Sequence, residues 1–285
     1  MRQSPLWGIT VLAIMATQAL ATFTAEPPQP LPRETIEAWK EAGGQVGWMR
    51  VEKYGSLKLL PEKEGAAGDL PAFAFSTWKD GLLPKLPAPA AAFGLNLMGS
   101  QVRDVGLKDL AGLKNLRALN LRFNQVSDAG LKELAALKNL QTLNLGFTYV
   151  SDTGLKQLAA LENLETLELF RTQVTAAGLK ELAGLKKLHT LDLGGTRVAD
   201  AGLKELADLK NLQALNLNST LVTDAGLKDL ALLKKLQTLD LRGTQVTDAA
   251  LKELRKTLPD CKISLKVKPL QLEIPSPPKK DKKPR

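Results

Sequence analysis

The stretch VTDAGLKDLALLKKLQTLDLRGTQVTDAAL, residues 222–251, ends by starting again. Its first six residues, VTDAGL, return 24 positions later as VTDAAL. A sequence that repeats at a fixed period of this length predicts a solenoid, because one unit cannot bury its apolar residues alone and packs on its neighbours.

Leucines keep the 24-residue spacing from one unit to the next without an insertion. The pattern begins upstream at Leu95 and Leu97 and ends downstream at Ile263 and Leu265, which predicts eight strand sites in unbroken register. Between these ends the leucines lie at 116, 119 and 121; 140, 143 and 145; 164, 167 and 169; 188, 191 and 193; 212, 215 and 217; and 236, 239 and 241.

Each unit contains two kinds of periodicity. The pattern L-x-x-L-x-L alternates apolar and polar residues, as a short strand with one buried face does. The segment that follows, such as VSDAGLKELAAL at 126–137, spaces its leucines as one face of a helix. Ser127 or Asp128 can cap the first turn of that helix. Glycines at 106, 130, 154, 178, 202 and 226 predict a close approach of neighbouring turns, and only Ala250 departs from this column.

These units resemble the leucine-rich repeat family, in the variant that reads L-x-x-L-x-L-x-x-T-x-V-[ST]-D-x-G-L-x-x-L. The resemblance implies an α/β solenoid shaped like a horseshoe, with parallel strands on the concave face, short helices on the convex face, and protein binding as the usual role. Many family members carry asparagine after the strand, which here is found only at Asn124. Hydroxyl residues, expected to bond the turn backbone instead, occupy the other equivalents: Ser100, Thr148, Thr172, Thr196, Thr220 and Thr244.

The two ends of the chain differ from the repeats. Residues 1–21 resemble a signal peptide, with an apolar run from Leu6 to about Ala16 and a small-x-small site at Ala19-Leu20-Ala21. We therefore expect an exported protein, with an uncleaved membrane anchor as the alternative. Residues 22–33 read as a proline-rich spacer, 34–91 as an N-terminal cap, 92–265 as the repeat domain and 266–285 as a disordered basic tail rich in proline and lysine.

The predicted cap, residues 34–91, has its own pattern, which indicates a short amphipathic helix, a Gly-Gly turn and a strand. A solenoid has an exposed end that needs covering, and a small independent binding domain is the alternative. The expected core residues are Trp39, Val46, Trp48, Val51, Phe73, Phe75, Trp78, Leu82 and Leu83.

Composition excludes several functional classes. The net charge is +9, but residues 266–285 contribute +5 and Arg2 adds one, so the body is close to neutral and offers no surface for specific nucleic-acid binding. One cysteine and one histidine leave no disulfide and no zinc cluster. The chain has no phosphate loop, dinucleotide fingerprint or nucleophile elbow, so we expect no enzyme activity, no cofactor and no metal.

Binding residues should lie at the variable positions. The middle residues of L-x-L form one row, which we interpret as the solvated polar surface of the concave face. Calcium is disfavoured because Asp192 and Asp240 lie two strands apart, about 10 Å. The row contains Asn96, Asn120, Asn144, Glu168, Asp192, Asn216 and Asp240.

Aromatic and arginine side chains, the usual anchors of a protein interface, follow the strands. Phe123, Phe147 and Phe170 occur in three successive repeats and are expected to form one patch, unless each ring packs over its own turn. The candidate protein-binding residues are Met98, Arg122, Phe123, Phe147, Tyr149, Phe170, Arg171, Asp192, Asp240 and Arg242.

The sequence thus predicts a monomeric, non-enzymatic scaffold that binds an unidentified protein partner with the concave face of the solenoid. One alternative is a structural or envelope-associated protein whose basic tail makes weak electrostatic contact with acidic surfaces. The repeats also resemble those of ubiquitin-ligase substrate receptors, but no F-box-like segment precedes them and an export signal does not suit that role.

Overall fold

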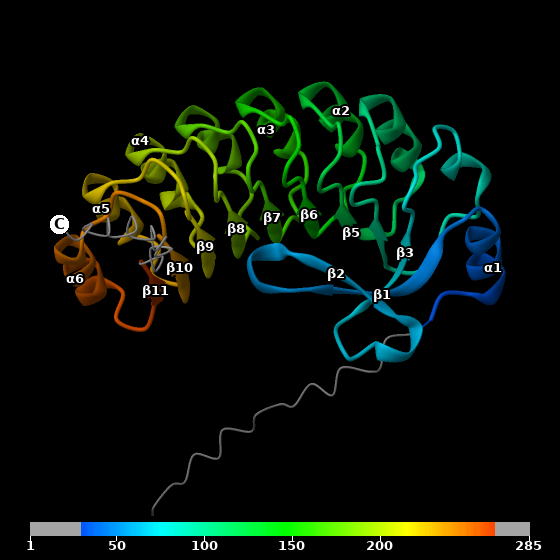
Figure 1. Cartoon of the computed structure of the whole chain (residues 1–285), viewed down its shortest axis with the longest axis horizontal. Helices are drawn as coiled ribbons and strands as arrows, with labels where there is room; N and C mark the ends of the chain where they lie inside the picture. The colour runs from blue at the N-terminus through cyan, green and yellow to red at the C-terminus, as the bar shows by residue number, and fades with distance from the viewer. Residues whose placement is uncertain (1–29, 266–285) are drawn as a thin grey trace, which may run out of the picture.

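The computed structural model describes residues 30–265, and the strands of this range form one curved, eleven-stranded sheet (Figure 1). Eight strands, β4 to β11, follow one another in parallel at the predicted sites, so the sheet order is β11-β10-β9-β8-β7-β6-β5-β4-β3-β1-β2. The strands are β1 (Gln45–Val51), β2 (Leu57–Pro61), β3 (Leu70–Ala74), β4 (Phe93–Asn96), β5 (Leu116–Asn120), β6 (Thr142–Asn144), β7 (Thr166–Glu168), β8 (Thr190–Asp192), β9 (Ala214–Asn216), β10 (Thr238–Asp240) and β11 (Lys262–Ser264).

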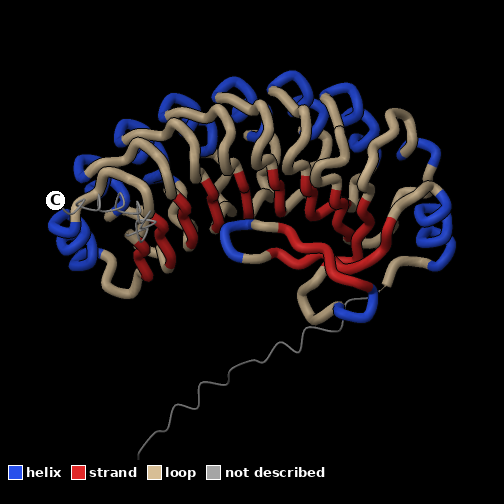
Figure 2. The backbone as a smooth tube through the Cα atoms, in the orientation of Figure 1, coloured by secondary structure: helices blue, strands red, loops and turns tan. Residues whose placement is uncertain are grey.

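The helical segments of the repeats line the convex side (Figure 2). They are short, and several wind as the tighter 3-10 helix, of which η4 and η5, with nine and seven residues, are longer than is usual for this type. They are η4 (Asp104–Gly112), α2 (Asp128–Leu134), α3 (Asp152–Leu158), η5 (Ala176–Leu182), α4 (Asp200–Leu203), η6 (Lys204–Asp208), η7 (Asp224–Gly226), α5 (Leu227–Leu230) and α6 (Asp248–Thr257). The N-terminal region adds α1 (Arg33–Glu41), η1 (Lys53–Gly55), η2 (Glu62–Glu64) and η3 (Leu83–Lys85).

The leucine columns form the core between the strands and the convex helices. Leu119, Leu143 and Leu167 pair in register across β5, β6 and β7, and all three are fully buried. Each buried leucine contributes about 2 kcal/mol through the removal of its side chain from water. The fold therefore depends on stacking rather than on any single repeat.

A carboxylate clamp joins successive repeats. The Asp128 carboxylate accepts two hydrogen bonds from Ser151 of the next repeat, one from the backbone N–H at 2.8 Å and one from the hydroxyl at 2.6 Å. Ser127, in contrast, caps its own helix by accepting from the Ala129 N–H. Of the two residues predicted as possible helix caps, Ser127 caps the helix, and Asp128 binds the next repeat. The five clamps are Asp104 with Ser127, Asp128 with Ser151, Asp152 with Thr175, Asp200 with Thr223, and Asp224 with Thr247.

The glycine column makes room for this clamp. A Cβ atom at Gly154 would overlap the Asp128 carboxylate, and one at Gly130 would lie 2.5 Å from Asp104 Oδ1. The predicted close approach of neighbouring turns is thus between a glycine and the aspartate of the preceding repeat.

The hydroxyl residues after the strands bond the turn backbone as predicted. The Thr148 hydroxyl donates to the Leu145 carbonyl, three residues earlier in the same repeat, and the other hydroxyls in the column do likewise. Asn124 also reaches the preceding repeat, where its amide donates to the Leu97 carbonyl and accepts from the Val102 N–H. A hydroxyl therefore replaces the hydrogen bond that asparagine makes within its own repeat, but not the hydrogen bonds that asparagine makes to the preceding repeat.

Residues 30–91 continue the sheet rather than forming a separate body. Strand β3 pairs parallel with β4, and β1 pairs antiparallel with both β3 and β2. The helix, Gly-Gly turn and strand follow in the predicted order, and Trp39 and Phe73 stack at 4.1 Å in the core. Phe75, Trp78 and Leu83 are also buried, and Val46 and Leu82 pack against the core.

The prediction for Val51 is wrong, because its side chain is 45% exposed. Val51 shares a face of β1 with the buried Gly47 and Met49, but it lies at the end of the strand, next to the exposed Glu52, while Trp48 on the opposite face is only partly buried. Met49 packs with Leu57 of β2 against the concave side of the sheet. The β1–β2 hairpin consequently runs across the concave side, and its tip, η1, contacts strands β6 to β9 (Figure 1).

The last repeat ends in α6, the longest of the convex helices, and in Cys261, whose side chain is buried. Burial raises the pKa of the Cys261 thiol to about 11. Within residues 30–265, no helix has the length and apolar character needed to cross a membrane. The predicted signal peptide and basic tail lie outside the described residues.

Candidate protein-binding surface

One residue in each repeat, two positions after the strand's last core leucine, has a left-handed backbone conformation. Glycine occupies three of these positions, Gly99, Gly195 and Gly243, as expected for positive φ. Phe123 and Phe147 occupy the same column at φ values of 58° and 54°. Arg171 and Ser219 are the other two members, with φ values of 53° and 54°. A side chain in this conformation costs about 1–2 kcal/mol, so two adjacent phenylalanines here are unusual.

The phenylalanines form one patch, as predicted. Phe123 stacks on Phe147 with ring centroids 4.3 Å apart, and Phe147 contacts Phe170 at 5.4 Å. The alternative, in which each ring packs over its own turn, does not describe them, because the rings bridge three repeats. Phe123 remains 46% exposed, so the stack opens to solvent.

Arg122 holds the stack together from beneath. Its guanidinium carbon lies 4.9 Å from the Phe123 ring centroid and 4.7 Å from that of Phe147. Its Nη1 also donates to both oxygens of Glu168, two strands away, at 2.9 Å. Gly146 lies under this ion pair, where any Cβ atom would collide with the Glu168 carboxylate. The bare glycine thus allows Arg122 to reach across a whole repeat.

Arg171 closes the patch on its C-terminal side. Its guanidinium lies 5.5 Å from the Phe147 ring and 5.8 Å from the Phe170 ring, within the range of a cation–π contact. No carboxylate of residues 30–265 lies within ion-pairing distance of it. We call the set Arg122, Phe123, Phe147, Phe170 and Arg171 the Phe–Arg ridge.

The polar row of the concave face is not the solvated surface that the sequence predicts. Asn120, Asn144, Glu168, Asp192, Asn216 and Asp240 are all at most 7% exposed. The amide oxygen of Asn144 accepts from the N–H two residues on, and Asp192 and Asp240 do the same with a carboxylate oxygen. These residues therefore cap the turns that follow the strands, and the β1–β2 hairpin lies over the middle of the row.

Two of the predicted binding residues are part of this covered floor. Asp192 accepts from Asn216 Nδ2 at 3.0 Å, and burial raises the pKa of its carboxyl. Burial also raises the pKa of the Glu168 carboxyl. The positive charge of Arg122 lowers this pKa, but by less than burial raises it. Asp240 forms an ion pair with Arg242 at 2.5 Å, and this contact raises the pKa of the Arg242 guanidinium. Within residues 30–265 the carboxylates do not group in a way that could hold a metal ion.

The remaining predicted residues lie apart from the ridge contacts. Met98 is 49% exposed on the first repeat strand's turn, and Tyr149 is 59% exposed two residues beyond Phe147. The aromatic stack consists of Phe123, Phe147 and Phe170, without the Tyr149 ring. Both lie in repeats that border or contribute to the ridge.

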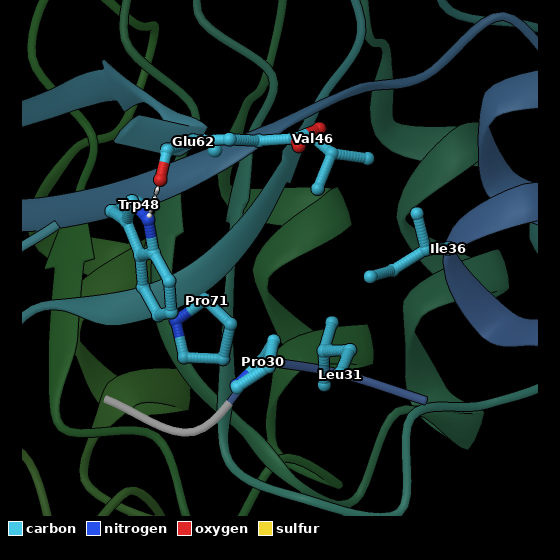
Figure 3. A pocket seen from close by; sticks show the side chains of 8 residues that line it. Pro30, Leu31, Ile36, Val46, Trp48, Glu62 and Pro71 are labelled. Carbon is cyan, nitrogen blue, oxygen red and sulfur yellow. Dashed lines mark hydrogen bonds between the residues drawn. The ribbon is translucent and has the colours of Figure 1, made fainter. Parts of the chain in front are cut away.

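A separate recess lies between α1 and the strands of the N-terminal region (Figure 3). Its lining is mostly apolar, and Trp48 Nε1 donates to the Glu62 carbonyl at its rim, at 2.8 Å. None of the predicted binding residues lines this recess.

Comparison with protein families matches the same repeats. The model described as "Leucine Rich repeats (2 copies)" covers residues 114–158, and the one described as "Leucine Rich repeat" covers 160–183, 184–207 and 233–254. The chain is a leucine-rich repeat protein. No curated protein matches it.

Two solved structures from Listeria monocytogenes str. 4b F2365 are similar to this repeat protein. One is an internalin with 22% identity and a TM-score of 0.46, over 61% of this chain and 53% of that one, so the chain spans about half its length. The other is internalin C2, also with 22% identity, with a TM-score of 0.47 over 82% of this chain and 93% of that one. At this identity the similarity concerns the fold alone.

Sequence reasoning missed two features of the surface, the Glu168 anchor of Arg122 and the hairpin over the floor. A signal for the hairpin exists in the sequence. The first concave position of the repeats holds threonine in β6, β7, β8 and β10 and alanine in β9, whereas three successive strands carry small residues where the hairpin root packs, namely Ala72, Gly94 and Ala118.

Proposed function

We propose that this repeat protein is a non-enzymatic scaffold that binds another protein through the Phe–Arg ridge at the rim of the concave face. The observation that carries the proposal is the left-handed backbone of Phe123 and Phe147. Glycine fits that position in three other repeats, so the two rings are held at a cost that packing of the solenoid does not require.

The ridge has the properties of a preorganised interface. Stacking between the rings and the Arg122–Glu168 ion pair fix the side chains before a partner arrives, which lowers the entropy lost on binding. Aromatic and arginine residues are the types that carry most of the binding energy in protein interfaces. A contiguous patch of exposed aromatic rings on a protein surface also indicates an interaction site.

The charges of the ridge indicate the chemistry of its partner. Glu168 neutralises Arg122, whereas Arg171 is exposed and its guanidinium contacts two rings but forms no ion pair within residues 30–265. A partner surface with an apolar centre beside an aspartate or glutamate would complement both features, because a carboxylate pairs with the guanidinium of Arg171.

A double substitution, Phe123→Gly with Phe147→Gly, tests the proposal. Both changes remove a ring and relieve the left-handed strain, so the solenoid should keep its melting temperature to within a few degrees. Capture of partners from the native envelope should be lost. Ser219→Gly, in the same left-handed column but without a ring, is the matched control and should capture normally. Unchanged capture by the double variant would refute the proposal.

Export of the protein belongs to the same proposal. The resemblance of residues 1–21 to a signal peptide supports it, and N-terminal sequencing of the protein isolated from its native cell would test it. A first residue at or near position 22 is the expected result, and an intact N-terminus would favour the membrane-anchored alternative.

A further inference from the structure

The tip of the β1–β2 hairpin, residues 52–56, covers the centre of the concave face. Gly55 is buried, and a Cβ atom there would overlap the Thr166 methyl group of β7. Tyr54 is partly buried, and the turn that carries it contacts β6 to β9. Its environment includes Thr238, Asp192, Asp240 and Arg242, all of which influence the phenol. Burial raises the pKa of Tyr54, and the Asp240 carboxylate raises it further.

The hairpin is fixed to the sheet at its root. Met49 and Leu57 form a small apolar cluster with Ala72 and Ala118. Gly94 lies directly beneath Met49, where a Cβ atom would come within 2.7 Å of the methionine sulfur. Strand β1 is also hydrogen-bonded on both sides, to β2 and to β3. The root is therefore part of the sheet and its core.

The tip has a different kind of attachment. Its backbone hydrogen bonds in the described structure stay within the turn, such as Glu52 N–H to the Ser56 carbonyl at 2.7 Å and Gly55 N–H to the Glu52 carbonyl at 3.1 Å. Glu52, Lys53 and Ser56 are exposed. Within residues 52–56, Gly55 is buried and Tyr54 is partly buried, and Tyr54 has a φ of 57°, an unfavourable backbone conformation for tyrosine.

We propose that the tip is a lid over a second binding surface, the floor formed by β7 to β10, which takes a tyrosine-bearing turn of another polypeptide once the lid opens about its apolar root. The tip itself is the template for that ligand. Its tyrosine is partly buried, and its glycine gives the backbone close access to Thr166. This surface borders the Phe–Arg ridge, because Glu168 of β7 lies beside Gly55 of the tip and also anchors Arg122 of the ridge.

Thiol labelling of the folded full-length chain tests the lid. In a Cys261→Ala background, Thr166→Cys places a thiol under the tip and Ala118→Cys places one under the root. If the tip opens while the root stays packed, the thiol at 166 reacts much faster than the thiol at 118. Tyr54→Ala should accelerate labelling at 166 by about tenfold, the effect of losing one ring contact, and leave labelling at 118 unchanged.

Equal labelling rates at 166 and 118 would overturn the lid, because both thiols would then be exposed only by unfolding of the whole hairpin. A Tyr54→Ala effect of the same size at both positions would overturn it too. Circular dichroism of each variant checks that the fold is retained.

A synthetic peptide tests the ligand. The probe is a cyclic peptide with the sequence of residues 50–58, and its target is a chain in which residues 52–56 are replaced by Asn-Gly, a turn that preserves the root. Binding should occur to this chain and be at least tenfold weaker to the unaltered one, whose tip competes intramolecularly. A peptide with alanine in place of tyrosine should also bind at least tenfold more weakly. Equal binding of the two peptides, or none at millimolar concentration, would overturn the ligand chemistry. Normal ridge-dependent capture by the same chain separates this outcome from failure of the proposed function.

Discussion

The carboxylate clamp between repeats is interrupted once, and repairing it gives a quantitative test of how the solenoid is held together. Ala176 occupies the position of the clamp aspartate. Ala199, in the repeat that follows, occupies the position of the serine or threonine that donates to that aspartate in the other clamps. The two members of one clamp are thus missing together. Gly202, the glycine that would face the carboxylate, is retained and packs against Ala176.

We expect Ala176→Asp and Ala199→Ser to stabilise the protein more together than their separate effects predict. Serine alone caps α4, whose N-cap Ala199 has no side-chain bond, and adds about 0.5–1 kcal/mol. Aspartate alone accepts the Ala199 N–H and adds about 0.5–1 kcal/mol. In existing clamps the carboxylate also accepts the hydroxyl at 2.5–2.8 Å, a bond that only the double variant can form. This bond contributes about 1 kcal/mol of coupling.

Thermal and urea unfolding of the original chain, the two single variants and the double variant measure the coupling. For a protein of this size 1 kcal/mol corresponds to about 2–4 °C, so the double variant should melt that much above the additive value. The reverse cycle, Asp128→Ala with Ser151→Ala, removes an existing clamp and should return a coupling of similar size. Additivity within about 0.3 kcal/mol in both cycles would refute the clamp as an energetic link between repeats.

Three further outcomes follow from contacts described above. Gly154→Ala should destabilise the protein by about 1–2 kcal/mol, because its Cβ displaces the carboxylate of the preceding repeat, whereas Gly184→Ala, with open space around it, should not; urea unfolding distinguishes them. Arg50 lowers the pKa of Asp69 chiefly by a hydrogen bond, so the stability this carboxylate provides is present above the pKa of about 3.9 that aspartate has when unfolded, and is lost as pH falls through the lower folded value. Asp69→Asn should therefore destabilise the chain at pH 7 and flatten its acid unfolding profile, and an unchanged profile would contradict this. The Cys261 thiol, with its pKa raised to about 11, should alkylate far more slowly than free cysteine at pH 8, and a rate like that of the free amino acid would contradict its burial.

The repeat pattern was sufficient to predict the parallel strands, because each leucine is buried against its own counterparts 24 residues away. The ridge could also be predicted in part. Phe123 and Phe147 stand out as large side chains where the periodic core does not need them, although Phe170 reaches the same stack from a neighbouring column.

The hairpin over the concave floor could not be predicted in this way. Gly55 lies against Thr166 only after the whole solenoid has curved, and no local spacing encodes a contact between segments so far apart in the chain. The sequence also left open whether Ser127 or Asp128 caps the helix, for another reason. Either oxygen can reach the first turn of the helix, and only the position of the next repeat decides which one turns outward.

The antiparallel strand at the N-terminal end of the sheet has a consequence for self-assembly. A stack of identical parallel strands with bare ends could add further molecules end to end and grow into a fibre. Here β1 reverses direction, and the outermost strand, β2, presents the exposed residues Lys58 and Pro61, of which proline has no N–H to donate. At the opposite end, β11 is short and exposes Lys262. The same hairpin that crosses the concave face therefore also terminates the growth of the sheet.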